Sequence, residues 1–411
     1  MPSININNGL VNNKWCIFVL IYILFYISTI NIWFIKLGAN NIPRIIYYSI
    51  IGTGIVLYFW DILKKQYIFR FFLLFFLYIF YCFFCIFLAE QSSLEAAYPY
   101  IILPSIMLSG YSLLKRVDLI FLTKCIAIAS TVIAPLTMYE YFTKSYLLPT
   151  ENDPYVVFRS RVFADSCLSL GCEYAIGALL CIAIWKKTKH KIWFVYGILN
   201  IIGLLFTQSR GPLVGCLVGI IILAWYDAWI NRTSRKLFFM GTIALVAIII
   251  FMIINSFGLI TIDNPIISRI ISIGNWDSDE GNIGRLFKWR AYSEVFLQSP
   301  IIGHGIGYVD NSRYGVTESG IIQQLVEIGI LGTVLYYSFI IKILKYGDKY
   351  AKCNPNGEGY LIVGLIAACV CVLVENCVLQ IFDNTIIGTL FWLFLSIIWF
   401  VSEGEIKRKK F

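Results

Sequence analysis

The sequence GRLFKWRAYSEVFLQSPIIGHGIG, residues 284–307, lies in the longest polar interruption of an otherwise apolar chain. Its first part, residues 284–298, predicts an amphipathic helix, because Arg285, Lys288 and Trp289 share one side at i, i+3 and i+4. The alternative is an interfacial helix whose tryptophan and arginine simply lie at the depth of the lipid headgroups.

The residues after this helix predict a stop and a turn. Pro300 ends a helix because its ring removes a backbone N–H and clashes with the preceding turn. Gly303, Gly305 and Gly307 then turn the chain. Arg290 lies about 140° around the helix from the first arginine, so the two are not expected to share one target.

The whole chain has the composition of a membrane protein. It has 411 residues, 59% hydrophobic and 14% charged, whereas a soluble domain carries about 25% charged residues. Apolar runs recur that are long enough to cross a ~30 Å hydrocarbon core as helices. We therefore expect an all-α polytopic membrane protein of about twelve transmembrane helices, with a large extracytoplasmic loop carrying short helices. The expected spans are 15–35, 43–60, 67–89, 99–114, 118–139, 166–185, 191–207, 211–230, 237–260, 319–341, 360–381 and 384–401.

Positive charge is distributed unevenly between the two predicted faces. The net charge of +9 comes largely from Lys and Arg in alternate short loops and in the C-terminal tail. This placement follows the positive-inside rule, so it indicates cytoplasmic loops and termini rather than nucleic-acid binding. The expected organisation is a membrane domain at 1–260, an extracytoplasmic loop at 261–318, and a membrane domain at 319–411 with a basic cytoplasmic tail.

Several charged residues lie at positions that the membrane disfavours, and these residues are candidates for function. Arginines on the predicted outer face oppose the inward bias of positive charge; the site candidates among them are Arg159, Arg161, Arg210, Arg285, Arg290 and Arg313. Glu173 and Glu375 lie inside predicted spans, where a carboxylate is expensive. The alternative for these two acids is a structural ion pair with a neighbouring arginine.

Short motifs follow one another along this predicted outer face. They are T-x-S-R-G at Thr207–Gly211, R-x-x-x-W at Arg285–Trp289, P-x-x-G-x-G at Pro300–Gly305 and E-x-G-x-x-G at Glu327–Gly332, with a weaker arginine motif at Arg161–Asp165. In this order they resemble the O-antigen ligase and polymerase superfamily of bacterial envelope glycosyltransferases. The resemblance covers residues 155–340 by motif and the rest of the chain by topology.

The resemblance implies a GT-C-like helical fold in the bacterial inner membrane, with the active site on the periplasmic face. Donor and acceptor would be undecaprenyl-diphosphate-linked glycans, and a chain-length regulator is a candidate partner. No cofactor or metal is implied, since arginines would stabilise the leaving diphosphate bidentately. Arg210 and Arg285 would have this role; the implied substrate-binding residues are Arg161, Arg159, Arg290, Arg313, Trp289, Glu173 and Glu375.

Glu318 would take the proton from the acceptor hydroxyl. Nearby arginines would weaken it as a base, so orienting the acceptor is an alternative role, and capping the tenth span is the structural one. Ligases of the superfamily have a histidine nine residues before the acid of E-x-G-x-x-G. Here the residue nine before Glu327 is Glu318, followed by serine, as in the polymerases.

The resemblance thus favours a polymerase that joins repeat units into a surface polysaccharide such as O-antigen. A ligase that transfers glycan to the lipid A core is the nearest alternative. A flippase or transporter would be expected to show an internal repeat and charges lining a central cavity. The polar residues instead concentrate at 261–318.

Overall fold

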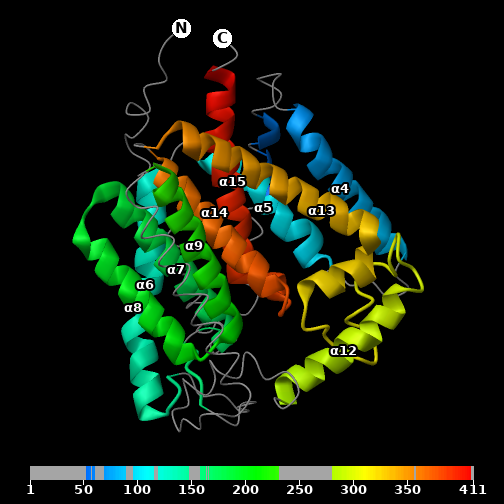
Figure 1. Ribbon diagram of the computed structural model, residues 1–411. Coiled ribbons are helices and arrows are strands. Elements are labelled where there is room, and N and C mark those ends of the chain that lie inside the picture. The colour runs from blue at the N-terminus through cyan, green and yellow to red at the C-terminus, as the bar shows by residue number, and fades with distance from the viewer. Residues whose placement is uncertain are drawn as a thin grey trace.

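The computed structural model describes residues 52–56, 58–60, 69–88, 96–114, 119–147, 158–162, 164, 166–230, 280–355 and 358–408. The predicted spans 15–35 and 237–260, part of span 43–60 and the stretch 261–279 of the long loop lie outside the described residues. Within the described ranges the chain forms helices and turns and no strand (Figure 1).

The helices form a bundle in which consecutive elements run up and down (Figure 1). In chain order they are α4 (Phe69–Leu88), the π-helix η3 (Tyr98–Ile102), α5 (Leu103–Leu114), α6 (Leu119–Thr143), α7 (Cys167–Thr188), α8 (Lys191–Thr207), α9 (Arg210–Ile230), α12 (Glu280–Phe296), α13 (Gly320–Cys353), α14 (Gly359–Asn376), the short η5 (Ile381–Asp383) and α15 (Thr385–Arg408).

In the part of the chain that the structure describes, six helices are long and apolar enough to cross a membrane, namely α6, α7, α9, α13, α14 and the Thr385–Ser402 part of α15. The segment Leu73–Leu88 and helix α8 are shorter but also apolar. All of them fall on predicted spans, which is consistent with the expected polytopic membrane protein. The total of twelve spans stays a prediction, because some of those spans lie outside the described residues.

Helix α13 differs from its prediction in length. The expected span ended at residue 341, but the helix continues to Cys353. Buried Ile343 and Ala351 extend its apolar side, while Lys352 pairs with Asp348 at i, i+4 with a distance of 2.6 Å. This amphipathic pattern keeps the segment helical beyond the expected membrane boundary.

The centre of the bundle is α7, whose side chains are buried along nearly its whole length. It packs against α6, α8, α9 and α14, and α15 packs against α5 and α13. Polar groups in this interior are bonded across helices: Asn200 Nδ2 donates to Thr131 Oγ1 at 2.7 Å, and Ser396 Oγ donates to the Met107 carbonyl at 2.9 Å. Bonds between helices of this kind satisfy polar groups that would be costly in an apolar interior.

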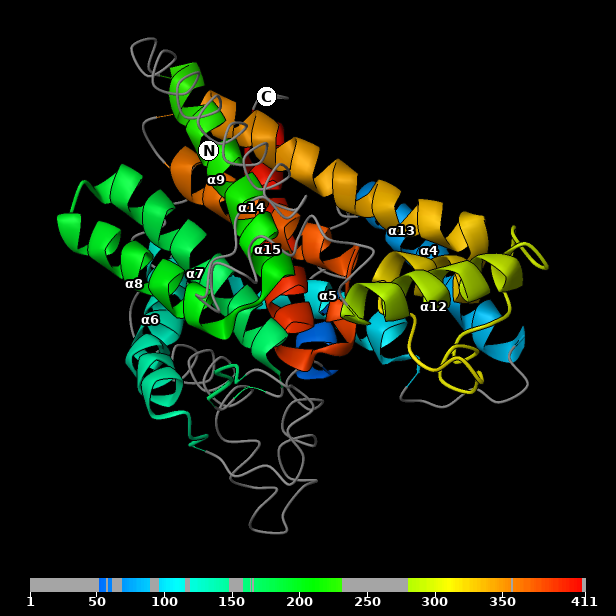
Figure 2. The same cartoon turned by 60° about the horizontal axis from the view of Figure 1, so that its bottom comes forward.

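One end of the bundle, here called the lysine-rich end, joins the ends of α7, α9 and α13 to the start of α14. Asp227 on α9 accepts from Lys186 Nζ at 2.9 Å and from Tyr360 Oη at 2.7 Å. Tyr226 Oη donates to the Ala351 carbonyl at 2.7 Å. The opposite end, where α12 packs beside the start of α13, is here called the α12 end (Figure 2).

Helix α13 is broken at Gly329, and the glycine-rich turn fits into the break. Gly329 has φ +62° and interrupts the helix. Two turn amides donate to helix carbonyls, His304 N to Val326 at 2.8 Å and Gly305 N to Glu327 at 3.0 Å. The helix returns the contact, since Ile330 N donates to the Pro300 carbonyl at 2.9 Å. The P-x-x-G-x-G and E-x-G-x-x-G motifs therefore satisfy each other's backbone groups.

This interlock needs glycine on both sides. A Cβ at Gly303 would collide with the Glu327 carbonyl, and one at Gly329 would collide with the Ile301 carbonyl. Both residues also have positive φ, at +82° and +62°, a conformation that a side chain makes costly.

We expect Gly329→Ala to destabilise the protein. The left-handed backbone alone costs about 1–3 kcal/mol for a residue with a side chain, and the collision with the Ile301 carbonyl adds to it. Thermal unfolding of the purified protein in detergent measures the loss. Gly284→Ala is the matched control, because an added Cβ there meets nothing within 4 Å and alanine favours a helix. Equal midpoints for the two variants would contradict the interlock.

Candidate functional site

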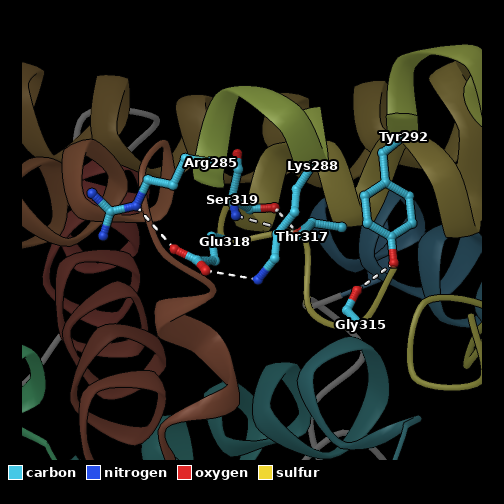
Figure 3. A network of polar contacts seen from close by, with 7 residues as sticks. All are labelled: Arg285, Lys288, Tyr292, Gly315, Thr317, Glu318 and Ser319. Atoms are coloured by element: carbon cyan, nitrogen blue, oxygen red, sulfur yellow. Dashed lines mark hydrogen bonds and ion pairs between the residues drawn. The ribbon is translucent and has the colours of Figure 1, made fainter. Parts of the chain in front are cut away.

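The first part of the site joins α12 to the start of α13. The Glu318 carboxylate lies between two cations of α12 and accepts from Arg285 Nε at 3.0 Å and from Lys288 Nζ at 2.8 Å (Figure 3). All three side chains are partly exposed, at 29%, 23% and 25% of their surface. The predicted one-sided helix therefore presents two neighbouring cations to one carboxylate, which a water-soluble substrate group can reach.

Glu318 reaches α12 because its backbone is left-handed, with φ +54°. This conformation is uncommon for a residue with a side chain, and where it occurs the surrounding structure maintains it. Ser319, not Glu318, caps α13, since its side chain accepts from Ile322 N at 3.4 Å. Thr317 is buried and its hydroxyl donates to the Ser319 carbonyl at 2.7 Å. The capping role considered for Glu318 is therefore wrong.

The second part of the site is the buried end of α14. Glu375 is 1% exposed, and its carboxylate lies against Gly211, where a Cβ would collide with it. Glu375 also interacts electrostatically with Arg285. The next residue, Asn376, lies against Gly320 at the first turn of α13. The end of α14 thus connects the start of α9, the start of α13 and the cations of α12.

The Thr207–Gly211 motif forms the tight turn between α8 and α9. Gln208 has φ +53° and ends α8, and Ser209 Oγ donates to the Cys167 carbonyl at 2.8 Å, so the turn is tied to the start of α7. Arg210 is the partly buried first residue of α9. The starts of α7, α9 and α13 therefore meet at the α12 end, and their partial positive charges favour an anion there.

Arg159 and Arg161 lie in a segment held by a buried acid that the sequence analysis missed. Glu140, near the end of α6, is 0% exposed. Its carboxylate accepts from the backbone amides of Arg161 at 3.0 Å, Val162 at 2.9 Å and Leu147 at 2.8 Å. The Arg161 guanidinium stacks on Tyr146 at 4.6 Å. The signal was present, since Glu140 is an acid at the end of an apolar run, as Glu375 is.

A second missed acid is Glu327, which the sequence analysis used only as a motif position. It is 1% exposed and accepts from the backbone amides of Gly307 at 3.0 Å and Val309 at 3.1 Å. Its carboxylate therefore holds the last glycine of the turn against α13. Lys288 was placed on the cationic side of α12 but not among the candidate site residues, although it pairs with Glu318 as directly as Arg285 does.

The remaining candidates are spread around this centre. Glu173 is buried on α7, two residues after Gly171. Gly171 itself packs against Ser209. Trp289 is partly buried on α12, whereas Arg290 is exposed there. Arg313 stacks on Tyr314 at 4.8 Å in the loop before α13. The structure thus brings together Arg285, Glu318, Glu375 and the Arg210 turn, and it places Arg290 and Arg313 in other surroundings.

The fold and this cluster define a helical membrane protein with a charged site where several helix ends meet. Residues 195–337 match the family model described as O-antigen ligase. This segment contains the Arg210 turn, Arg285, Glu318 and both interlocked motifs. The predicted resemblance to the O-antigen ligase and polymerase superfamily is therefore confirmed for this segment. No curated protein matches the chain.

Proposed function

We propose that the protein polymerises undecaprenyl-diphosphate-linked oligosaccharide repeat units into a surface polysaccharide at the outer face of the bacterial cytoplasmic membrane. The observation that carries the proposal is the pairing of Glu318 with Arg285 and Lys288, beside buried Glu375 and the Arg210 turn. This arrangement offers cations for a diphosphate and a carboxylate for an acceptor hydroxyl within one site.

In the proposed reaction, an acceptor hydroxyl oxygen attacks the anomeric carbon of the donor glycan. The new glycosidic bond forms as the bond from that carbon to the diphosphate breaks, and undecaprenyl diphosphate leaves with the bonding electrons. Arg285, Lys288 and Arg210 stabilise the growing negative charge, because fixed cations are most effective where charge develops. Glu318 accepts the hydroxyl proton.

The ion pairs of Glu318 suggest how these two roles are coupled. A diphosphate competes with Glu318 for the same two cations, whose distances from the carboxylate are 3.0 Å and 2.8 Å. Binding of the donor therefore transfers Arg285 and Lys288 to phosphate oxygens and releases the carboxylate toward the acceptor. In this scheme the base becomes free only when a donor is in place.

The proposed orientation places the α12 end outside and the lysine-rich end in the cytoplasm. Lys186, Lys187 and Lys189 gather at the end opposite α12, as the positive-inside rule expects of a cytoplasmic face. Both termini are proposed to be cytoplasmic, with the inner membrane as the location. A chain-length regulator is proposed as a partner, and no nucleic acid is.

Polymerase is proposed over ligase because Glu318 occupies the position at which the ligases have histidine. The family match is compatible with either activity, and the flippase alternative gains no support from it. A ligase would use the same cations for the same leaving group, and only the acceptor would differ.

Purified protein reconstituted with a single lipid-diphosphate repeat unit tests the proposal. We expect a ladder of products that differ by one repeat on a gel, and we expect EDTA to leave the ladder unchanged. Transfer only to added lipid A core would identify a ligase instead. An absolute requirement for a divalent metal would contradict the role given to the cationic side chains.

A further inference from the structure

A cavity of about 880 Å³ lies beyond the end of α12, within the loop that leads to α13. Its polar and aromatic lining comprises Gln298, His304, Tyr308, Asn311, Arg313 and Tyr314. The volume is within the range of roughly 300–1,000 Å³ typical of ligand sites. Leu88, the last residue of α4, also lines it, so the cavity opens beside the end of a proposed membrane helix.

The side chains around the cavity are held in place by contacts of their own. His304 and Tyr308 stack with ring centroids 4.6 Å apart, and His304 Nε2 donates to the Val295 carbonyl at 2.9 Å. Arg313 lies over the Tyr314 ring and donates to its hydroxyl at 2.6 Å. Asn311 Nδ2 donates to the Gly307 carbonyl at 2.9 Å. A lining that is already ordered loses little conformational freedom when a ligand binds.

The chemistry of this lining suits a carbohydrate. Flat aromatic side chains offer apolar faces on which the C–H face of a pyranose can pack. Amide groups donate and accept hydrogen bonds, and a guanidinium donates them, in the paired geometry that vicinal hydroxyls present. A purely apolar ligand would make no hydrogen bonds with Asn311 and Arg313. A lone phosphate would have no apolar face to pack on the two tyrosine rings.

Hydrogen bonds connect the cavity to the proposed reaction centre. Tyr292 lies one turn after Lys288 on α12, and its hydroxyl donates to the Gly315 carbonyl (Figure 3). The same hydroxyl bonds with Ser312 in the cavity wall. Glu318 follows three residues after Gly315. Val295 at the cavity lies roughly 15 Å along the helix axis from Arg285, at about 1.5 Å per residue. A glycan that reacts at Glu318 can therefore extend into the cavity with its further sugars.

We propose that this cavity is an oligosaccharide subsite that holds sugars several rings away from the bond being formed. The identity of the glycan rests on the proposed function, whereas the binding itself does not. The glycan comes either from the growing donor chain or from the acceptor repeat unit. In both cases the cavity strengthens the binding of the substrate and so favours a longer product.

The test uses the full-length protein in lipid nanodiscs. The probe is the lipid-free oligosaccharide of one repeat unit, released by mild acid from the lipid-linked repeat unit of the producing cell, with binding measured calorimetrically. We expect Tyr308→Leu to weaken binding at least tenfold and Tyr308→Phe, which keeps the ring, to bind within threefold of wild type. Gln298→Ala, at an exposed position, should also weaken binding and serves if Tyr308→Leu does not fold.

Two results separate this inference from the proposed function. Arg285→Ala should lose turnover but bind the lipid-free probe as wild type does. During polymerisation, Tyr308→Leu should give shorter polymers. If the donor occupies the cavity, the loss of rate in this variant grows with the length of the donor glycan. If the acceptor occupies it, the loss of rate is the same for all donor lengths. Wild-type polymerisation with no probe binding, or with binding indifferent to Tyr308 and Gln298, overturns the subsite alone. Probe binding that depends on Tyr308, without any polymerisation, overturns the proposed function alone.

Discussion

Glu318→Gln should abolish polymer in cells while the amount of protein in the membrane stays the same. Glutamine keeps the size of the side chain and can still contact Arg285 and Lys288, but it cannot accept a proton from the acceptor. General base catalysis contributes about 10²–10⁴-fold to rate, so we expect a loss of that order. The measurement is the rate of repeat-unit addition by purified protein, together with the polysaccharide ladder from cells.

Glu294→Gln provides a matched control for this variant. Glu294 is an exposed acid on α12, so the same chemical change occurs on an adjacent element outside the ion-paired cluster. It should give polymer at the wild-type rate. If Glu318→Gln made polymer of normal length, the carboxylate would have no part in the reaction. It would act neither as the base nor as the group that holds the two cations until the donor binds.

Arg285→Ala should reduce kcat/KM for the lipid-diphosphate donor by about 10²–10³-fold, the cost of removing one group that stabilises charge in a transition state. Arg285 pairs with Glu318 at 3.0 Å and also interacts electrostatically with buried Glu375. Arg285→Lys should recover little, because an ammonium group cannot grip two phosphate oxygens as the guanidinium fork does. Steady-state kinetics with varied donor concentration provide the measurement.

Lys352→Ala removes a positive charge at the lysine-rich end and is the control for Arg285. Its ion pair with Asp348 is exposed, and exposed pairs contribute little to stability. We expect wild-type kinetics from this variant. If Arg285→Ala left the donor kinetics unchanged, Arg285 would not be the principal partner of the diphosphate, and the mechanism would be contradicted.

Local sequence predicted most of the helices and the composition of the site. Long apolar runs predicted α6, α7, α9 and α14, because an apolar segment of that length satisfies its backbone as a helix. The i, i+3, i+4 spacing of Arg285, Lys288 and Trp289 predicted α12. The predicted helix at 284–298 is close to the observed one, which runs from Glu280 to Phe296.

The contacts that assemble the site were beyond the reach of local patterns. Glu318 pairs with residues about thirty positions earlier in the chain, and Glu375 touches Gly211 on a helix far away in sequence. Glu140 stands out in the sequence as an acid at the end of an apolar run, but its partners are backbone amides of another segment, which no residue type marks.

The sequence by itself determined that this is a helical membrane protein, where the basic clusters lie along the chain, and which motifs resemble the O-antigen ligase and polymerase superfamily. These properties depend on residue type and short-range spacing, which a chain carries in its order. Only the tertiary structure decided that Glu318 faces α12 instead of capping α13, and that Glu375 lies against Gly211. The reason is physical: a left-handed backbone at one residue and the close approach of helices at glycines are set by packing between distant segments.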